Sequence, residues 1–303
     1  MGEYRGGGRA RSGVSRRQLF LLTGLSVVGF GSGVAYAEIS PPLSAGPVPS
    51  GQPGTAPSAP SARSSFAVAR TRPQLEQYIQ KVGGRLSIAV VDRVTGAQLS
   101  VGTRKFETAS IVKVDILAAL LLKHSKQGTT LTANERTLAT KMITVSDNDA
   151  ATQLFDAVGG VPGLTAANKT FGLRETAPTP DWGSTTTTAI DQVRLLQTVT
   201  APQSPLNEPS RELILKLMGD VVDEQAWGVS AAAPDAASGV FVKNGWDTRS
   251  ADDGRWVVNS IGRVKEDGHD WLVAVLSDHH QSQEKGITVV EGAAKLALTQ
   301  LRG

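Results

Sequence analysis

The hydrophobic and polar positions predict strands at both ends of the folded part of the chain and helices in its middle. Residues 85–91 and 97–101 are apolar or alternate around a polar turn at 92–96, which predicts a β-hairpin. Later strands are predicted at residues 239–242, 256–264 and 271–276. Helices are predicted at residues 72–82, 110–124, 132–158 with a break at 146–148, 187–199, 209–218 and 286–301.

This order of elements predicts an α+β fold. One antiparallel sheet would combine strands from both chain ends, and an all-helical subdomain, about residues 110–220, would pack beside it. We expect residues 66–303 to form this domain. A functional site would lie in the seam between the sheet and the helices, because pockets favour the boundaries between packed parts.

Residues 1–37 have the pattern of an export signal. A basic stretch containing Arg16 and Arg17 is followed by an apolar run at 19–34, and Ala35-Tyr36-Ala37 has the small-x-small form of a cleavage site. The twin arginine predicts the twin-arginine export route. The apolar run is short and contains four glycines, so no stable membrane span is expected in the mature form. We expect the mature protein outside the cell or on the cell-wall side of the membrane.

Composition narrows the classes of function. Residues 38–65 hold seven of the fifteen prolines among Ser and Ala, which predicts an extended linker. The formal charge of +3 is smaller than the +4 carried by residues 1–37, so the remainder is close to neutral and no nucleic-acid partner is expected. The chain has no cysteine, and its four histidines lack the clustered spacing of a metal site. We therefore expect no metal and no cofactor.

Ser110-Ile111-Val112-Lys113 stands at the start of the predicted apolar helix at 110–124. A spacing of three places the serine and the lysine on the same helix face. A serine hydroxyl becomes a good nucleophile when a base removes its proton, and a lysine with a lowered pKa can be that base. The alternative is a helix cap, since serine is favoured there. The same pattern recurs in the polar segment Ser282-Gln283-Glu284-Lys285.

Ser146-Asp147-Asn148 separates two predicted helices. Taken alone, it is most simply a polar turn between helices, capped by Asp or Ser. In a catalytic interpretation, Ser146 would relay a proton to the leaving group. Asn148 would bind the substrate amide and orient Lys113, while Asp147 would hold the turn together.

Lys243-Asn244-Gly245 ends the segment predicted as a strand from residue 239. Lys243 would hold a substrate carboxylate and polarise Ser146, and Asn244 is a further candidate for substrate binding. Gly245 would let a substrate approach the strand backbone closely.

Two further features would complete such a site. The backbone N–H groups of Ser110 and Trp246 would form an oxyanion hole, which is worth several kcal/mol in acyl transfer. Arg249 and Arg255 are alternative sources of a second cation, although a surface role is the simpler interpretation of each.

With its three motifs in this order, the chain resembles class A β-lactamases and the related penicillin-recognising enzymes, whose signature is Ser-x-x-Lys, Ser-Asp-Asn and Lys-Thr-Gly. The resemblance covers about residues 68–303. It extends to the sequence context at residues 106–109, 143–151 and 185–188. It implies a β-lactamase/transpeptidase-like fold and an acyl-enzyme formed on Ser110 with β-lactams or related amides.

Three departures from the family pattern bear on activity. Ser146 follows Ser110 by only 36 positions, which predicts a more open cleft. The loop at 174–183 lacks the family's Glu-x-x-Leu-Asn element, and Glu175 fits the preceding turn better, so the deacylation base is unassigned. Asn244 replaces the usual Thr or Ser, and a bulky Trp246 follows the glycine. Because loss of a general base typically costs a factor of ~10² to 10⁴, we predict acylation with slow deacylation.

Three functions stay open at this point. The first is an exported hydrolase of the β-lactamase type, favoured by the length and the overall pattern. The second is a D,D-peptidase or another peptidoglycan, amide or ester hydrolase, favoured by the open cleft and the missing glutamate. The third is a non-enzymatic module that keeps the fold and is only acylated or only binds. In each case we expect a monomer that takes a small-molecule ligand.

Overall fold

The computed structural model describes residues 73–83 and 85–302. The predicted export signal and linker lie outside the described residues. The strands are β1 (Leu86–Asp92), β2 (Gln98–Val101), β3 (Phe106–Glu107), β4 (Thr186–Thr187), β5 (Gly239–Arg249), β6 (Arg255–Glu266) and β7 (His269–His280). The α-helices are α1 (Pro73–Lys81), α2 (Val112–Gln127), α3 (Ala133–Thr144), α4 (Asn148–Val158), α5 (Gly160–Phe171), α6 (Ala189–Thr200), α7 (Glu208–Gly219) and α8 (Gln283–Arg302).

The main sheet is antiparallel and has the strand order β2-β1-β7-β6-β5. Its central pairing joins the two ends of the domain, because β1 from the N-terminal part pairs with β7 from the C-terminal part, with Ile88 opposite Val275. This confirms the predicted α+β fold. β5 lies at one edge of the sheet, next to β6.

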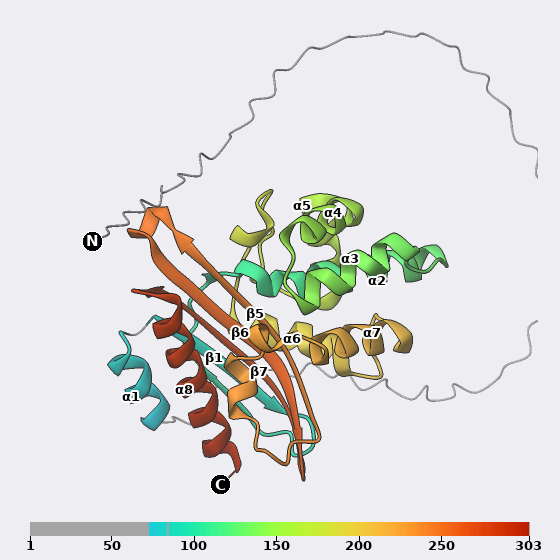
Figure 1. Ribbon diagram of the computed structural model, residues 1–303. Helices are drawn as coiled ribbons and strands as arrows, with labels where there is room; N and C mark the ends of the chain where they lie inside the picture. Colours follow the sequence, from blue (N-terminus) through green and yellow to red (C-terminus); the bar gives the residue numbers. More distant parts are fainter. Residues whose placement is uncertain (1–72, 84, 303) are drawn as a thin grey trace, which may run out of the picture. The chain divides into compact units, whose positions relative to one another are not determined.

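Helices cover both faces of this sheet, as Figure 1 shows. The helices α1 and α8 lie on one face, and the helical middle of the chain lies on the other. Side chains along β7 alternate accordingly: Leu272 and Ala274 join the core shared with the helical middle, whereas Trp271 and Val273 join the core under α1 and α8.

The helix α2 runs through the centre of the helical part. Its residues from Val112 to Leu122 are all buried, including one lysine and one aspartate. A helix that is apolar all round belongs inside a protein. It begins after a 3₁₀ turn, Ala109–Ile111, so the predicted start at residue 110 falls within that turn.

The prediction missed two features of this part of the chain. The helix α5 begins with Gly160 and contains Pro162 and Gly163, which usually signal a loop, but proline is tolerated in the first turn of a helix. A Cβ on Gly163 would lie 2.2 Å from Val158 O, so α4 and α5 meet closely there. The small sheet of β3 with β4 was also unpredicted.

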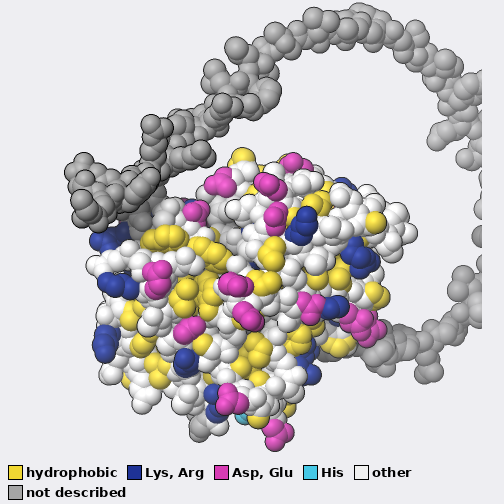
Figure 2. Space-filling view, viewed as in Figure 1, with side chains coloured by type: hydrophobic (Ala, Val, Ile, Leu, Met, Phe, Trp, Pro, Cys, Tyr) yellow, Lys and Arg dark blue, Asp and Glu magenta, His cyan; other side chains and the backbone are white. Residues whose placement is uncertain are grey.

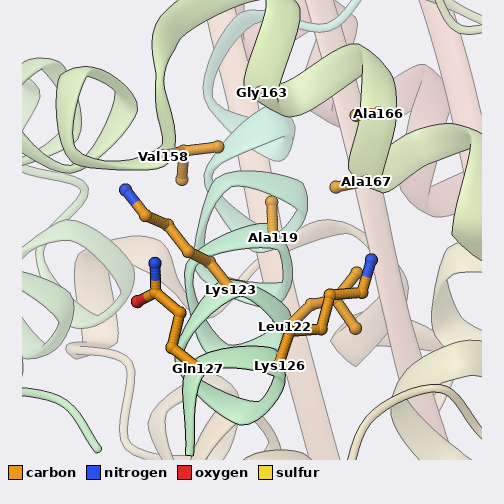
Figure 3. Close-up of a pocket in the computed structure, with 9 residues that line it drawn as sticks. All are labelled: Ala119, Leu122, Lys123, Lys126, Gln127, Val158, Gly163, Ala166 and Ala167. Carbon is orange, nitrogen blue, oxygen red and sulfur yellow. The ribbon is translucent and has the colours of Figure 1, made fainter. Parts of the chain in front are cut away.

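A pocket of about 260 Å³ lies between the C-terminal half of α2 and the helix α5, with Val158 at the end of α4 beside it (Figure 3). Lys123 and Lys126 stand over a floor of small apolar side chains, and Lys123 Nζ donates to Ala157 O at 2.5 Å. This pocket is therefore separate from Ser110, which precedes the other end of α2.

Acidic and basic side chains are interspersed on the face of the molecule drawn in Figure 2. Within the described part of the chain, no helix combines the length and the apolar character that crossing a membrane requires.

Candidate active site

The candidate nucleophile Ser110 lies in the 3₁₀ turn Ala109–Ile111, directly before α2. The residue before it, Ala109, has φ +45°, in the left-handed region that residues other than glycine rarely adopt. The residue before β4 and a residue of β6 hold this turn in place. Thr108 N donates to Thr185 O at 2.7 Å, and Asn259 Nδ2 donates to Thr108 O at 3.1 Å. Within the described part of the chain, the Ser110 hydroxyl forms no hydrogen bond.

Lys113 lies in the first turn of α2 and is fully buried. Its Nζ donates to Ser146 O at 2.7 Å, to Ser146 Oγ at 3.1 Å and to Asn148 Oδ1 at 2.7 Å. Burial lowers the pKa of Lys113 to about 7, although the charge of Asp147 opposes the shift. An amine with this pKa exchanges its proton near neutral pH, as a general base requires.

The turn between α3 and α4 presents Ser146 to two amines. Ser146 has φ +60°, and its Oγ accepts from Lys113 Nζ at 3.1 Å and from Lys243 Nζ at 3.0 Å. Asp147 caps α4 by accepting from Ala150 N at 2.7 Å, so it holds the turn as predicted. Asn148 contacts Lys113 as predicted, and its binding of a substrate amide stays a prediction.

Lys243 reaches the same point from the sheet. It lies within β5, is 1% exposed, and donates to Ser146 Oγ and to Asn244 O at 2.8 Å. Burial, assisted by the nearby Lys113 amine, holds the pKa of Lys243 well below its ordinary value. Lys113 and Lys243 are 33 and 97 positions from Ser146 in the sequence, and both amines donate to its hydroxyl.

Two amines surround this hydroxyl, and neither is paired with an acid among the described residues. No carboxylate in residues 73–83 or 85–302 forms an ion pair with Lys113 or Lys243, and Asp147 acts on Lys113 only from a distance. Because a buried cation without a partner is costly, the pKa values of both lysines are lowered.

Gly245 faces the turn that carries Ser110, and the prediction that it lets a substrate approach stays a prediction. A Cβ at this position would lie 2.7 Å from Ser110 N and from Ile111 N, and 2.8 Å from Thr108 O. The β5 backbone thus packs directly on the backbone of the turn. Glycine is needed here for contact within the protein.

Gly245→Ala is expected to destabilise the protein by ~1–3 kcal/mol and to slow any acylation of Ser110, because its Cβ would displace the turn. The matched control is Gly239→Ala in the same strand, where the Cβ would meet the end of the Phe241 ring instead of backbone atoms. Urea denaturation and the rate of labelling by a fluorescent penicillin would measure both effects. Equal behaviour of the two variants would contradict the prediction.

The assignment of the Asn244 side chain to substrate binding is wrong. The strand β5 continues to Arg249 instead of ending at the motif, and neighbouring side chains on a strand point to opposite faces. Asn244 is 1% exposed, and its Nδ2 donates to Gln225 O at 2.7 Å and to Trp227 O at 2.9 Å. It therefore ties β5 to the preceding segment.

Trp246 points its ring to the same side as Asn244, where it lies 5.8 Å from the Trp227 ring. Its backbone N–H remains a candidate oxyanion donor together with that of Ser110. Because β5 is an edge strand, alternate N–H groups along it have no partner strand.

The two candidate second cations differ in their surroundings. Arg249 at the end of β5 pairs with Glu107 and, at 3.1 Å, with Asp247. Its charge is therefore already balanced. Arg255 lies across the β5–β6 hairpin and acts on Asp252. Neither contact identifies a substrate-binding arginine.

The loop before β4 brings no carboxylate to Lys113. Glu175 Oε2 pairs with Lys105 Nζ at 2.8 Å, and both side chains are about half exposed. Trp182 lies against the site instead, with Lys113 Nζ 5.0 Å from its ring centroid. Sequence reasoning missed Trp182 and Asn259, because their contacts depend on tertiary structure and neither belongs to a motif.

Comparisons with known proteins agree with this architecture. The sequence model of the family described as "Beta-lactamase enzyme family" matches residues 122–301. The "Putative lipoprotein LppW" of Mycobacterium tuberculosis is 36% identical over 116 residues, and the match spans 37% of each chain. The curated relatives are thus matched over little more than a third of their length.

Solved structures share the fold. PBP-A has a TM-score of 0.64 at 22% identity, with 78% of this chain and 98% of that chain covered. A class A β-lactamase from Mycobacterium abscessus has a TM-score of 0.65 at 18% identity, with 76% and 98% covered. These likenesses confirm the β-lactamase/transpeptidase-like fold. Since the family model spans more than half of the sequence, this chain belongs to the β-lactamase enzyme family.

Proposed function

We propose that the protein is a serine hydrolase that forms an acyl-enzyme on Ser110 with β-lactams or related amides and releases the product slowly. The observation that carries this proposal is that the amines of Lys113 and Lys243 both donate to the Ser146 hydroxyl. Lys243 belongs to β5, the strand that packs against the backbone of the Ser110 turn. A lysine with a pKa of about 7, a bridging hydroxyl and a buried second amine are the groups that serine acyl transfer needs.

In this proposal, acylation begins when neutral Lys113 takes the proton of Ser110 Oγ. The serine oxygen attacks the carbonyl carbon, and the backbone N–H groups of Ser110 and Trp246 stabilise the resulting oxyanion. As the bond from the carbonyl carbon to the leaving nitrogen breaks, Ser146 passes its hydroxyl proton to that nitrogen and takes a proton from the protonated Lys113 amine, which restores both groups. Lys243 holds the substrate carboxylate. The contact between Gly245 and the Ser110 backbone supports the pairing of the two N–H donors, because it brings β5 beside Ser110.

Hydrolysis of the acyl-enzyme needs a base that can activate water. Glu175 pairs with Lys105 instead of Lys113, and no carboxylate of the described residues is in contact with Lys113. Slow deacylation is therefore part of the proposal. A PBP-A variant has been described as an acyl-enzyme complex with penicillin G, and that protein has a similar fold.

We further infer that the protein acts outside the cell or on the cell-wall side of the membrane. Two observations support this inference. Residues 1–37 have the pattern of a twin-arginine export signal. The curated relative is named as a lipoprotein, which suggests export.

The proposal is tested by intact-protein mass spectrometry during incubation with benzylpenicillin. We expect a mass increase of one benzylpenicillin that persists, maps to the peptide containing Ser110 and is absent in Ser110→Ala. A folded protein that gains no adduct and hydrolyses no β-lactam would contradict the acyl-enzyme. Rapid steady-state hydrolysis of a chromogenic β-lactam would contradict slow deacylation.

A D,D-peptidase is the second candidate, and the absence of a carboxylate at Lys113 among the described residues favours it. Release of D-alanine from a peptide ending in D-Ala-D-Ala, measured with the same preparation, distinguishes it from a β-lactam hydrolase. A module without enzymatic activity would release no D-alanine, whether or not it is acylated.

A further inference from the structure

Trp182 connects three elements around the site. It begins the 3₁₀ turn Trp182–Ser184 in the loop before β4, and its ring packs against the helical core. Its indole Nε1 donates to Thr152 Oγ1 of α4 at 3.1 Å. The ring also faces α2, with Lys113 Nζ 5.0 Å from its centroid.

The loop holds the indole in place. Asp181 Oδ2 accepts from Ser184 Oγ at 2.7 Å, and Asp181 O accepts from Thr179 Oγ1 at 2.5 Å. Ala177 forms a bridge with Thr186, which ties the start of this loop to β4. Together with the bond to Thr152, these contacts give the ring a defined position.

The ring completes the enclosure of the Lys113 amine. Three oxygen acceptors from Ser146 and Asn148 lie around Nζ, the Trp182 ring lies over it, and the side chain has no exposed area. A cation–π contact favours the charged form of the amine. The pKa of Lys113 nevertheless falls to about 7, so loss of water outweighs that attraction.

This enclosure bears on deacylation. In that step water attacks the ester carbonyl carbon, the bond from this carbon to Ser110 Oγ breaks, and a proton of the water passes through a base to Ser110 Oγ. Lys113 is a suitable base three positions from Ser110, but it has no solvent-exposed area and forms no ion pair with a described carboxylate. An indole ring accepts no proton from water.

We propose that Trp182 is a positioning residue that prolongs the acyl-enzyme by shielding the Lys113 amine from water. The proposal rests on the proposed acyl-enzyme at Ser110. In this proposal, Lys113 is a base competent for deacylation, and the aromatic ring of Trp182 covers its amine. The hydrogen bond from Trp182 to Thr152 holds the ring in this position.

The test compares Trp182→Ala, Trp182→Phe and Thr152→Val in the full chain. After labelling with benzylpenicillin and removal of the excess, intact mass spectrometry follows the loss of the adduct. Trp182→Ala is expected to lose it at least ~10-fold faster, at the lower end of what a general base contributes. Trp182→Phe keeps a ring and should stay within ~3-fold of the wild-type protein. Thr152→Val frees the indole at an exposed position and should shorten the lifetime by an intermediate factor.

A second readout separates this role from a merely structural one. Admission of water should move the midpoint of the acylation rate against pH upward by ~1 unit in Trp182→Ala, because less burial raises the pKa of Lys113. An unchanged adduct lifetime and midpoint in folded Trp182→Ala would overturn the proposal. If that variant does not fold, Trp182→Leu, apolar but without a ring, is judged by the same criteria. Absence of any adduct in the wild-type protein would instead contradict the proposed function.

Discussion

Lys113→Met is expected to slow acylation of Ser110 by a factor of ~10² to 10⁴, which is the usual contribution of a general base. Methionine keeps an unbranched apolar stem inside the helical core but cannot take a proton from the serine. The measurement is the rate of adduct formation with benzylpenicillin. Lys126→Met is the matched control, because Lys126 lies exposed near the other end of α2. A loss of less than ~10-fold in Lys113→Met would assign the base to another group.

The same assignment predicts how the rate depends on pH. Burial lowers the pKa of Lys113 to about 7, so the fraction of neutral amine increases as the pH rises through this value. The acylation rate of the wild-type protein should therefore rise between about pH 6 and 8 and level off above. Lys113→Met should lose this limb, and Lys126→Met should keep it. A flat wild-type profile across this range would contradict a lysine base.

Much of the fold could be predicted from the hydrophobic pattern, because both the alternation typical of strands and the spacing typical of helices are clear in this chain. Alternating or continuous apolar segments mark β1, β6 and β7, and the apolar run after Ser110 marks α2. The prediction missed α5 because Gly160 and Pro162 are residue types that usually mark a loop. There the close packing of α4 and α5 at Gly163 outweighs local propensity.

The candidate site could be predicted only in part, and strand geometry explains one error. Neighbouring residues of a strand point to opposite faces, so Lys243 and Asn244 cannot both face Ser146, and the prediction treated the motif residues as one set. The meeting of Lys113 with Lys243 followed from the order of the family motifs. Spacing alone cannot bring together residues that lie so far apart in the chain.

The contacts of Trp182 and Asn259 were beyond prediction for a different reason. Each acts through a long-range contact, Trp182 with Thr152 and Asn259 with Thr108. No local pattern encodes such a contact. The positions that shape the nucleophile turn and its surroundings therefore emerge only when the sheet and the helices are assembled.

Asp115→Asn is expected to stabilise the folded protein above neutral pH by up to ~4 kcal/mol. Asp115 lies in α2, is 1% exposed, and neither carboxylate oxygen has a hydrogen-bond partner. Burial raises the pKa of its carboxyl to about 7; the Asn168 amide approaches and opposes this shift, and the charge of Asp191 adds to it. A shift of about three units, at 1.36 kcal/mol each, sets the upper limit. Asparagine has nearly the same shape and carries no charge.

The sign of the pH dependence follows from proton linkage. The folded protein binds the Asp115 proton more tightly than the unfolded chain, so this residue costs nothing near pH 3. Its cost grows as the pH rises from about 4 to 7 and stays constant above. The unfolding free energy of Asp115→Asn should therefore exceed that of the wild-type protein by an amount that increases over this pH interval.

Urea denaturation at several pH values measures this difference. Asp156→Asn removes an exposed carboxylate from α4 and should change stability by less than ~0.5 kcal/mol at every pH. A gap for Asp115→Asn that is the same at pH 4 and pH 8 would contradict the assignment. Because Asp115 and Lys113 lie on nearly opposite sides of α2, the acylation rate should change little. A large loss of acylation together with a gain in stability would mean that this buried carboxylate serves the site at the expense of the fold.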